Sequence, residues 1–322
     1  MKPPDSSPRS SSPWPRTIHH VVLCGAGAVG GSYAERFLAL DSSLLTVVAS
    51  GERRRRLEAE GLTVNGRRVP IRCRSPGEAA PPADLLLVGV KQHHLSAAIE
   101  DCRELVDPGT IVVSLLNGIS SEADLGRALG PEKVLPAFVI GNDVLREGSR
   151  IRYANIGRLF FGAPSNDPAD PRVVAVKSLL DRAGIPCVVP ADILHQQWFK
   201  FMLNVGVNQV SAVLRIPFGA FGQPEVRELI RRAAAEVVAV SGPEGVALSP
   251  DDPERIFPIV AALDPAGKSS MLQDVEACRK TEVEIFAGAV TDRGRRHGIP
   301  TPVNDLLGLE ITAWERLAGV RS

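Results

Sequence analysis

Continuous apolar runs, separated by helix-like segments, constrain the fold of this 322-residue chain more than any other feature. The clearest runs cover residues 84–90 and 110–116. Runs of this length without polar interruption are typical of strands that are buried on both faces of a parallel sheet. Their alternation with helical segments predicts an α/β fold with a doubly wound parallel sheet in the N-terminal part of the chain.

A glycine-rich loop follows an earlier short apolar run, residues 19–24, and opens a helix. It has the spacing G-x-G-x-x-G and consists of Gly25, Ala26, Gly27, Ala28, Val29 and Gly30. The first glycine permits a tight turn, the second lets the backbone approach a pyrophosphate, and the third lets the helix pack closely. In this context the motif predicts a Rossmann-type, dinucleotide-binding sheet, and a purely structural glycine turn is the alternative.

The strand pattern stops near residue 190, and the rest of the chain is predicted to be helical. Helical segments are expected over residues 192–213, 224–241, about 253–263 and 268–297. A chain of this length can form two separate cores, and a ligand cleft between them is the natural expectation. We predict a disordered Ser- and Pro-rich tail over 1–17, a dinucleotide-binding Rossmann domain over 18–190 and an all-helical substrate and catalytic domain over 191–322.

The residues after the second strand bear on the choice between NAD and NADP. An acidic residue at the end of that strand would bind the ribose 2′-hydroxyl of NAD. Here the strand ends at Ser50, and Glu52 is followed by arginines that include Arg53 and Arg54. Ser50 with Arg53 or Arg54 could hold a 2′-phosphate, which favours NADP (NADPH), although Glu52 opposes this and an arginine run also suits a solvated helix face.

Polar side chains also stand where two further strands end. Lys91 closes the run 84–90, and Asn117 closes the run 110–116. Ligands of open parallel sheets bind beyond the carboxyl ends of the strands, so both residues are placed to reach cofactor or substrate. A surface lysine and an ordinary Asn-Gly turn are the alternatives.

Overall composition excludes several classes of protein. With 37 basic and 37 acidic residues the net charge is zero, so no overall field would attract nucleic acid or an anionic membrane. No run approaches the roughly 20 apolar residues of a membrane-spanning helix. The five cysteines are scattered, and neither they nor the histidines have metal-site spacing. These features predict a cytoplasmic protein without a bound metal.

One apolar helical segment carries a regular polar stripe. Within residues 195–213, Lys200, Asn204 and Asn208 recur every fourth residue and therefore share one helix face. An ammonium group beside a carbonyl can stabilise an oxyanion and then donate a proton, and the two amides can bind oxygens without adding charge. The sequence thus predicts a polar cleft wall, with a lysine that covers apolar surface as the alternative.

Several segments together resemble the ketopantoate reductase (2-dehydropantoate 2-reductase) family. They are GAGAVGG, VKQHHLSAAI, LLNGIS, WFKFMLNVGVNQVSAV, SSMLQDVEACRKTEVEIFAGAV and HGIPTPVNDLL. The resemblance implies NADPH-dependent reduction of ketopantoate to pantoate, on the way to pantothenate and coenzyme A. It also implies roles for particular residues: Lys200 as general acid, Glu282 supporting Lys200 and contacting cofactor, Asn204, Asn208 and Ser270 on the substrate, and Lys91 and Asn117 at the cofactor–substrate junction.

Ser270 and Glu282 pose a geometric problem for this assignment. In a straight helix the twelve residues between them would span about 18 Å. A small 2-oxo acid cannot bridge that distance, so we expect Ser270 at a helix N-terminus with a turn in the chain, or one of the two away from the substrate.

Two departures from the family pattern define the alternatives. Ser50 stands where the family often has an arginine, and Gly267 stands where an asparagine is expected. A reductase of another bulky 2-oxo acid is therefore one alternative, and a non-catalytic NADPH-sensing protein on the same fold is another. Apolar positions in the last helices would form core or a subunit contact, so a homodimer through the helical domain is also expected.

Overall fold

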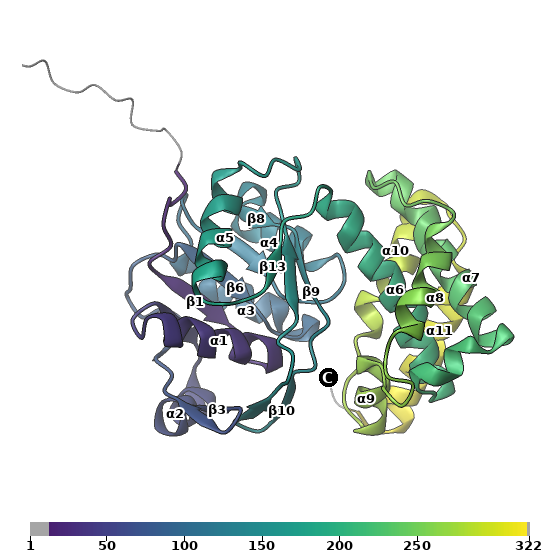
Figure 1. The fold of residues 1–322 in the computed structure, drawn as a ribbon, viewed down its shortest axis with the longest axis horizontal. Helices are drawn as coiled ribbons and strands as arrows, with labels where there is room; N and C mark the ends of the chain where they lie inside the picture. Colours follow the sequence, from purple (N-terminus) through teal and green to yellow (C-terminus); the bar gives the residue numbers. More distant parts are fainter. Residues whose placement is uncertain (1–12, 321–322) are drawn as a thin grey trace, which may run out of the picture.

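The computed structural model describes residues 13–320, and a six-stranded sheet forms the centre of its N-terminal part (Figure 1). Every neighbouring pair of strands in this sheet is parallel. The chain order reverses at β1, which lies between β2 and β6, and such a switch point is where open α/β sheets bind ligands. In spatial order the strands are β5 (Cys73–Arg74), β2 (Leu45–Val48), β1 (Val21–Cys24), β6 (Leu85–Val88), β7 (Ile111–Ser114) and β8 (Val134–Leu135).

Helices cover both faces of the sheet, which explains why its strands are apolar throughout. Val21 and Leu23 of β1 belong to one core cluster, whereas Val22 and Cys24 belong to the other. Alternate residues of a strand point to opposite faces, so no position of β1 meets water. The first cluster includes residues of α1 (Ala28–Leu40), α2 (Gly51–Glu60) and α5 (Pro171–Arg182), and the second includes residues of α3 (Leu95–Cys102) and α4 (Ser121–Leu129).

Two smaller sheets extend the N-terminal part. The apolar segment 134–140 is divided at Pro136, because proline cannot donate a ladder hydrogen bond: β8 belongs to the main sheet and β9 to another. One sheet has the order β10 (Leu145–Glu147), β11 (Arg150–Arg152), β3 (Leu62–Val64) and β4 (Arg67–Val69). The other has the order β13 (Cys187–Val188), β12 (Arg158–Phe161) and β9 (Ala137–Ile140).

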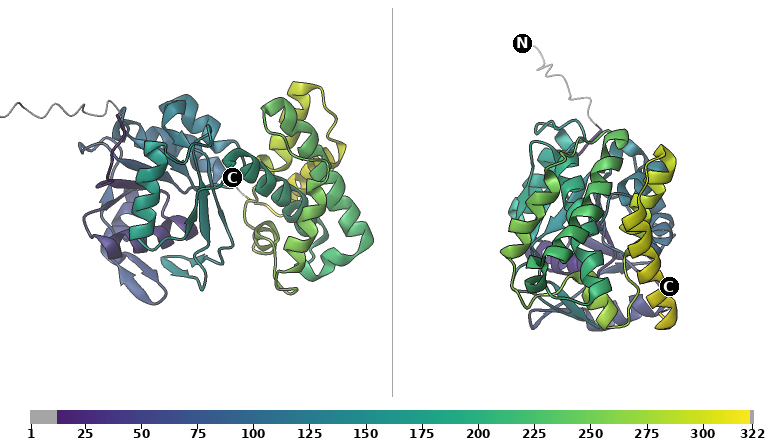
Figure 2. Two further views of the ribbon diagram at one scale, coloured as in Figure 1. Left: turned by 45° about the horizontal axis from the view of Figure 1, so that its top comes forward. Right: turned by 90° about the vertical axis from the view of Figure 1, so that its right-hand side faces the viewer.

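The C-terminal part is helical and is joined to the sheets through α6 (Figures 1 and 2). Asp192 caps α6 by accepting a hydrogen bond from the backbone N–H of His195 at 3.0 Å. The following helix, α7, packs along α6. The helices are α6 (Ile193–Leu214), α7 (Pro224–Ser241), α8 (Ile256–Ala261), α9 (Ser270–Glu276), α10 (Ala287–His297) and α11 (Pro302–Leu317).

Short 3-10 turns connect these elements. They are η1 (Gln92–His94), η2 (Arg103–Leu105), η3 (Pro131–Lys133), η4 (Phe218–Gly222), η5 (Gly242–Glu244), η6 (Asp252–Arg255) and η7 (Val283–Ile285). Across residues 13–320, every helix is too short or too polar to cross a lipid bilayer. The predicted α/β class, with a doubly wound parallel sheet followed by helices, is confirmed.

Two predictions about local structure are wrong. The expected helix over residues 268–297 is broken: α9 ends at Glu276, Cys278 takes a left-handed φ of 50°, and α10 starts only at Ala287. The predicted disordered tail also extends too far. Its residues 1–12 lie outside the described part, but Trp14 packs against the sheet core beneath the guanidinium of Arg172, 5.4 Å from the ring centroid.

The glycine turn after β1 generates a stability prediction. Gly25 has φ +103°, and a Cβ there would lie 2.5 Å from the carbonyl carbon of Gly89. Gly25→Ala should therefore destabilise the fold by about 3 kcal/mol, since it adds a backbone clash to conformational strain. Gly51 is the matched control, because its φ is +55° and a Cβ added to it would have no neighbouring atom within 4 Å. Gly51→Ala should cost only about 1 kcal/mol in urea unfolding, and equal losses for both variants would contradict the prediction.

Candidate active site

A cleft of about 820 Å³ opens beyond the carboxyl ends of β1, β6 and β7. The loops after these strands contribute one wall, which includes Gly27, Lys91 and Asn117. The opposite wall comes from the helical part and includes Ser270 and Glu282. Residues from three loops, from the start of α9 and from the segment beyond α9 thus line one space.

The glycine loop forms the floor of this cleft and has the shape that a dinucleotide needs. A side chain at Gly30 would place its Cβ 2.2 Å from the carbonyl oxygen of Gly25, so the turn closes only with glycine. Gly27, Ala28 and Val29 line the cleft, whereas Ala26 is fully buried. Because α1 begins here, its free N–H groups and positive dipole end favour a bound phosphate.

Asn117 connects the stripe on α6 to the cleft. Its Oδ1 accepts a hydrogen bond from Lys200 Nζ at 3.0 Å, and its Nδ2 donates to Glu282 Oε2 at 3.0 Å. Both the oxygen and the nitrogen of the amide are therefore hydrogen-bonded, and the opposite charges of the two partners fix the orientation of the amide. This one side chain brings Lys200 and Glu282 into a single network.

Lys200 is not among the residues that line the cleft and is linked to it through Asn117. Its ammonium also donates to the backbone oxygen of Val139 at 2.7 Å and lies 5.6 Å from the ring centroid of Phe138. Burial lowers the pKa of Lys200 to about 8, against the raising effect of the carboxylates of Glu282 and Glu122. A lysine with such a pKa can donate a proton near neutral pH more readily than an exposed lysine.

The two asparagines of the stripe lie deeper than the lysine. Asn204 and Asn208 are both 8% exposed. Asn208 Nδ2 donates to Ser270 Oγ at 3.5 Å, a long contact that links α6 to α9. Among residues 13–320, the side-chain amide of Asn204 has no hydrogen-bond partner, which leaves it available to a ligand.

The break after α9 resolves the geometric problem of Ser270 and Glu282. Ser270 is the first residue of α9, and the preceding Ser269 caps the helix by accepting from the Leu272 N–H at 3.1 Å. The chain then leaves the helical path, because Thr281 donates through both its backbone N–H and its hydroxyl to Glu315 on α11. These anchors return Glu282 to the cleft, so the two residues do not lie at the ends of one straight helix.

Only one of the three predicted phosphate-binding residues, Arg53, lines the cleft in the structure. Arg53 is exposed, lines the cleft and has no hydrogen-bond or ion-pair partner among the described residues. Arg54 instead pairs with Glu58 at 2.9 Å and with Glu78, so it is not available. Ser50 is the exposed N-cap of α2 and is not among the residues that line the cleft.

Two charged residues of the cleft had no assigned role in the sequence analysis. Asp274 binds Lys91 across the cleft, with 3.0 Å between carboxylate oxygen and Nζ, and also binds Arg279 at 2.8 Å. Arg146, on β10, donates to the backbone oxygen of Ala26 in the glycine loop. Burial, with repulsion from Arg53 and Arg56, lowers the pKa of Arg146. Asp274 stood inside a recognisable sequence block, but no sequence signal marked Arg146.

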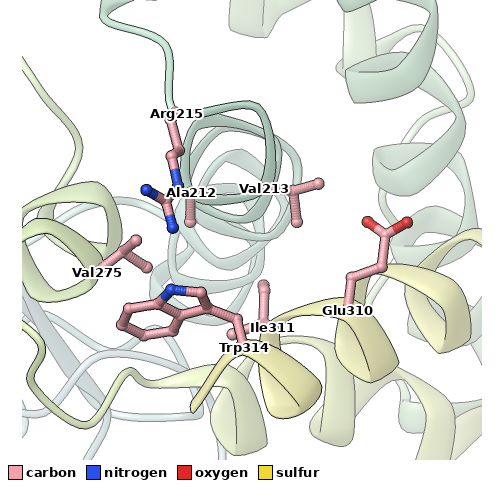
Figure 3. Close-up of a pocket in the computed structure, with 7 residues that line it drawn as sticks. All are labelled: Ala212, Val213, Arg215, Val275, Glu310, Ile311 and Trp314. Carbon is pink, nitrogen blue, oxygen red and sulfur yellow. The ribbon is translucent and has the colours of Figure 1, made fainter. Parts of the chain in front are cut away.

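A separate pocket of about 340 Å³ lies at the other end of α6 (Figure 3). Figure 3 shows the Arg215 guanidinium directed toward the Trp314 indole, with Glu310 on the opposite side. None of the predicted site residues lines it, so it is distinct from the cleft. No cluster of three or more His, Cys, Asp or Glu side chains in residues 13–320 is arranged to hold a metal ion.

Comparison with known proteins gives matches over most of the chain. Residues 21–166 match the family model "Ketopantoate reductase PanE/ApbA", and residues 192–313 match the model of its C-terminal domain. The 2-dehydropantoate 2-reductase of Pyrobaculum aerophilum is 30% identical over 296 residues, covering 92% of this chain and 98% of the relative. That of Halobacterium salinarum is 29% identical, covering 88% and 94%.

Solved structures have the same fold. A PanE/ApbA family ketopantoate reductase from Ralstonia eutropha superimposes with a TM-score of 0.81 at 25% identity, covering 93% of this chain and 99% of that one. A D-mandelate dehydrogenase bound to NADH and anilino(oxo)acetate superimposes with a TM-score of 0.82 at 22% identity, covering 94% and 100%. The family models and the curated relatives together place this chain in the ketopantoate reductase family.

Proposed function

We propose that this protein reduces 2-dehydropantoate (ketopantoate) to pantoate with NADPH, with Lys200 as the general acid. The observation that carries the proposal is the placement of the Lys200 ammonium. It is linked through Asn117 to a cleft that also contains a glycine loop shaped for a dinucleotide. Membership of the ketopantoate reductase family supports the choice of substrate.

The residues of the glycine loop fit a nicotinamide dinucleotide. Gly25 and Gly30 leave no room for side chains, and Gly27 exposes backbone at the start of α1. Arg53 and Arg146 add positive charge to the same cleft, which suits the phosphates of NADP. When bound, the reduced nicotinamide supplies the hydride that adds to the substrate carbonyl carbon.

Lys200 would complete the reduction on the oxygen side of the carbonyl. Its positive charge stabilises the negative charge that develops on this oxygen as the carbonyl π electrons move there. The proton then passes from Lys200 Nζ to the oxygen, leaving a hydroxyl group on the product and a neutral amine on Lys200. Asn117 and Glu282 orient the ammonium, while Asn204, Asn208 and Ser270 would bind the substrate oxygens.

Removing the lysine should abolish most of the turnover. Lys200→Ala is expected to lower kcat/KM for ketopantoate by about 10²- to 10⁴-fold, the usual contribution of general acid catalysis. Lys177→Ala is the control, because Lys177 pairs with Asp181 on the surface of α5, away from the cleft.

In the wild-type protein, reduction should slow above about pH 8 as Lys200 loses its proton. NADPH oxidation followed by absorbance tests both, and a wild type without turnover, or an unimpaired Lys200→Ala, would contradict the proposal.

Cofactor preference should depend on Arg53. Arg53→Ala is expected to raise the KM for NADPH about tenfold, corresponding to one charge-assisted contact with the 2′-phosphate, and to leave the KM for NADH unchanged. Arg55→Ala is a matched control on the same helix, because Arg55 pairs with Glu52 and does not line the cleft. Equal increases in the KM for NADPH and the KM for NADH would show that Arg53 does not bind the 2′-phosphate.

One observation favours a second candidate, a reductase of another bulky 2-oxo acid. At Gly267 a Cβ would lie 2.9 Å from the Asp264 carbonyl oxygen and 3.0 Å from the Phe218 ring. The asparagine expected there cannot be accommodated without movement of the turn. A panel of 2-oxo acids ranked by kcat/KM separates the two candidates, and tight NADPH binding without turnover of any of them would favour the non-catalytic alternative.

The expected homodimer through the helical part also remains a proposal. Exposed leucines support it, since Leu306 and Leu309 on α11 are 57% and 69% exposed. Apolar side chains that gather on one helix are more typical of a contact surface than of a solvated face. The oligomeric state in solution, measured by sedimentation at several protein concentrations, tests this proposal.

A further inference from the structure

A second carboxylate lies behind Lys200, outside the cleft. Glu122 belongs to the first turn of α4, a position where an acidic side chain usually faces solvent and favours the helix dipole. Here its Oε1 accepts a hydrogen bond from Gln197 Nε2 at 2.6 Å, and its Oε2 accepts from the Ser121 hydroxyl at 3.0 Å. Glu122 lines a separate pocket of about 420 Å³ beside α4 and is not among the residues that line the cleft.

Gln197 ties this carboxylate to the helix that carries Lys200. It is 5% exposed and precedes Lys200 by three residues on α6, so the two side chains leave the same helix face. Gln197 also donates to the backbone oxygen of Ala137 at 3.3 Å, while Lys200 donates to that of Val139. Carbonyls two residues apart on a strand point the same way, so α6 is fixed to β9 at two successive points.

The charges that face Lys200 come from two elements besides its own helix. Glu282, beside η7, approaches through Asn117, and Glu122 approaches from α4, and both raise the pKa of Lys200. The other nearby charges of α4 act elsewhere, because Asp124 pairs with Arg127 at 3.1 Å. Burial also raises the pKa of Glu122, so its support of Lys200 weakens as the pH falls.

We propose that Glu122, oriented by Gln197, is a positioning residue that keeps Lys200 charged and in place as the general acid, from the side of α4. The inference rests on the proposed reductase function of Lys200. The proposed role can be distinguished from a purely structural role of Glu122. Removing the charge of Glu122 changes the pKa of Lys200, and a change in this pKa has opposite effects on the rates of reduction and oxidation. Reduction of the 2-oxo acid needs the ammonium, whereas oxidation of the 2-hydroxy acid needs the neutral amine.

Glu122→Gln tests this, because the amide keeps the shape and an acceptor oxygen for Gln197 but removes the charge. Without that charge the ammonium is less stable, so the pKa of Lys200 falls. For a decrease of half a unit, reduction of ketopantoate at pH 9 should be about threefold slower than in wild type, and oxidation of pantoate by NADP at pH 7 about threefold faster. At pH 6.5 the reduction rates should be equal.

Matched variants separate charge from structure. Asp124→Asn removes the same charge from the same turn of α4 and should leave both pH profiles unchanged, since Asp124 does not contact α6. Glu122→Asp keeps the charge and should stay closer to wild type than Glu122→Gln. Unchanged profiles in Glu122→Gln, or equal losses in both directions at all pH values, would overturn the inference.

A titration without substrate separates this inference from the proposed function. In protein labelled with ¹³C at lysine Cε, the Lys200 signal, assigned with Lys200→Arg, reports the pKa directly. The signal should titrate at lower pH in Glu122→Gln than in wild type. A wild type without turnover contradicts the proposed function alone, whereas identical titration curves contradict the role of Glu122 alone.

Discussion

The amide of Asn117 joins the two halves of the site, because it is the only side chain that hydrogen-bonds both Lys200 and Glu282 among the described residues. Its position follows from the sheet: it lies in the loop after β7, which only β6 separates from the switch point at β1. Lys200 and Glu282 come from α6 and from the segment before η7, more than eighty residues apart in sequence. The geometry of the site therefore depends on how the helical part packs against the carboxyl edge of the sheet.

The stability of a charged lysine at this point depends on compensation from several groups. Burial disfavours the ammonium, and a carbonyl, an amide and an aromatic ring replace the lost water. Carboxylates on two sides oppose the effect of burial. The outcome is a pKa of about 8, which is low enough for proton release and high enough for the ammonium to predominate at neutral pH.

Local sequence patterns predicted the parts of the structure that local interactions determine. Apolar strands, the glycine turn and the stripe on α6 depend on backbone sterics and side-chain periodicity, and all of them lie where the sequence placed them. The break after α9 was missed because its cause is distant: Glu315 on α11 accepts hydrogen bonds from Thr281 and Lys280. Apolar periodicity contains no information about such tertiary contacts.

Several of the residues that motifs marked in the sequence lie near one another in the structure. Asn117, Ser270 and Glu282 line one cleft, and Lys200 contacts it through Asn117. Arg146 and Glu122 were missed because one stands in a short polar hairpin and the other looks like an ordinary acidic residue of a first helical turn. In both cases the partner that gives the residue its importance is a group far along the chain.

The division of contacts around the cleft has a consequence for proton exchange with solvent. Lys200 on α6 and Glu282 beside η7 both belong to the helical part, whereas Asn117 and Val139, which they contact, belong to the sheet part. If the two parts moved apart, Lys200 and Glu282 would move with the helical part, and the hydrogen bonds of Lys200 to Asn117 and Val139 would break. Closing the cleft would bury the Lys200 ammonium again and restore these bonds, so that closure and the proton equilibrium of Lys200 are linked.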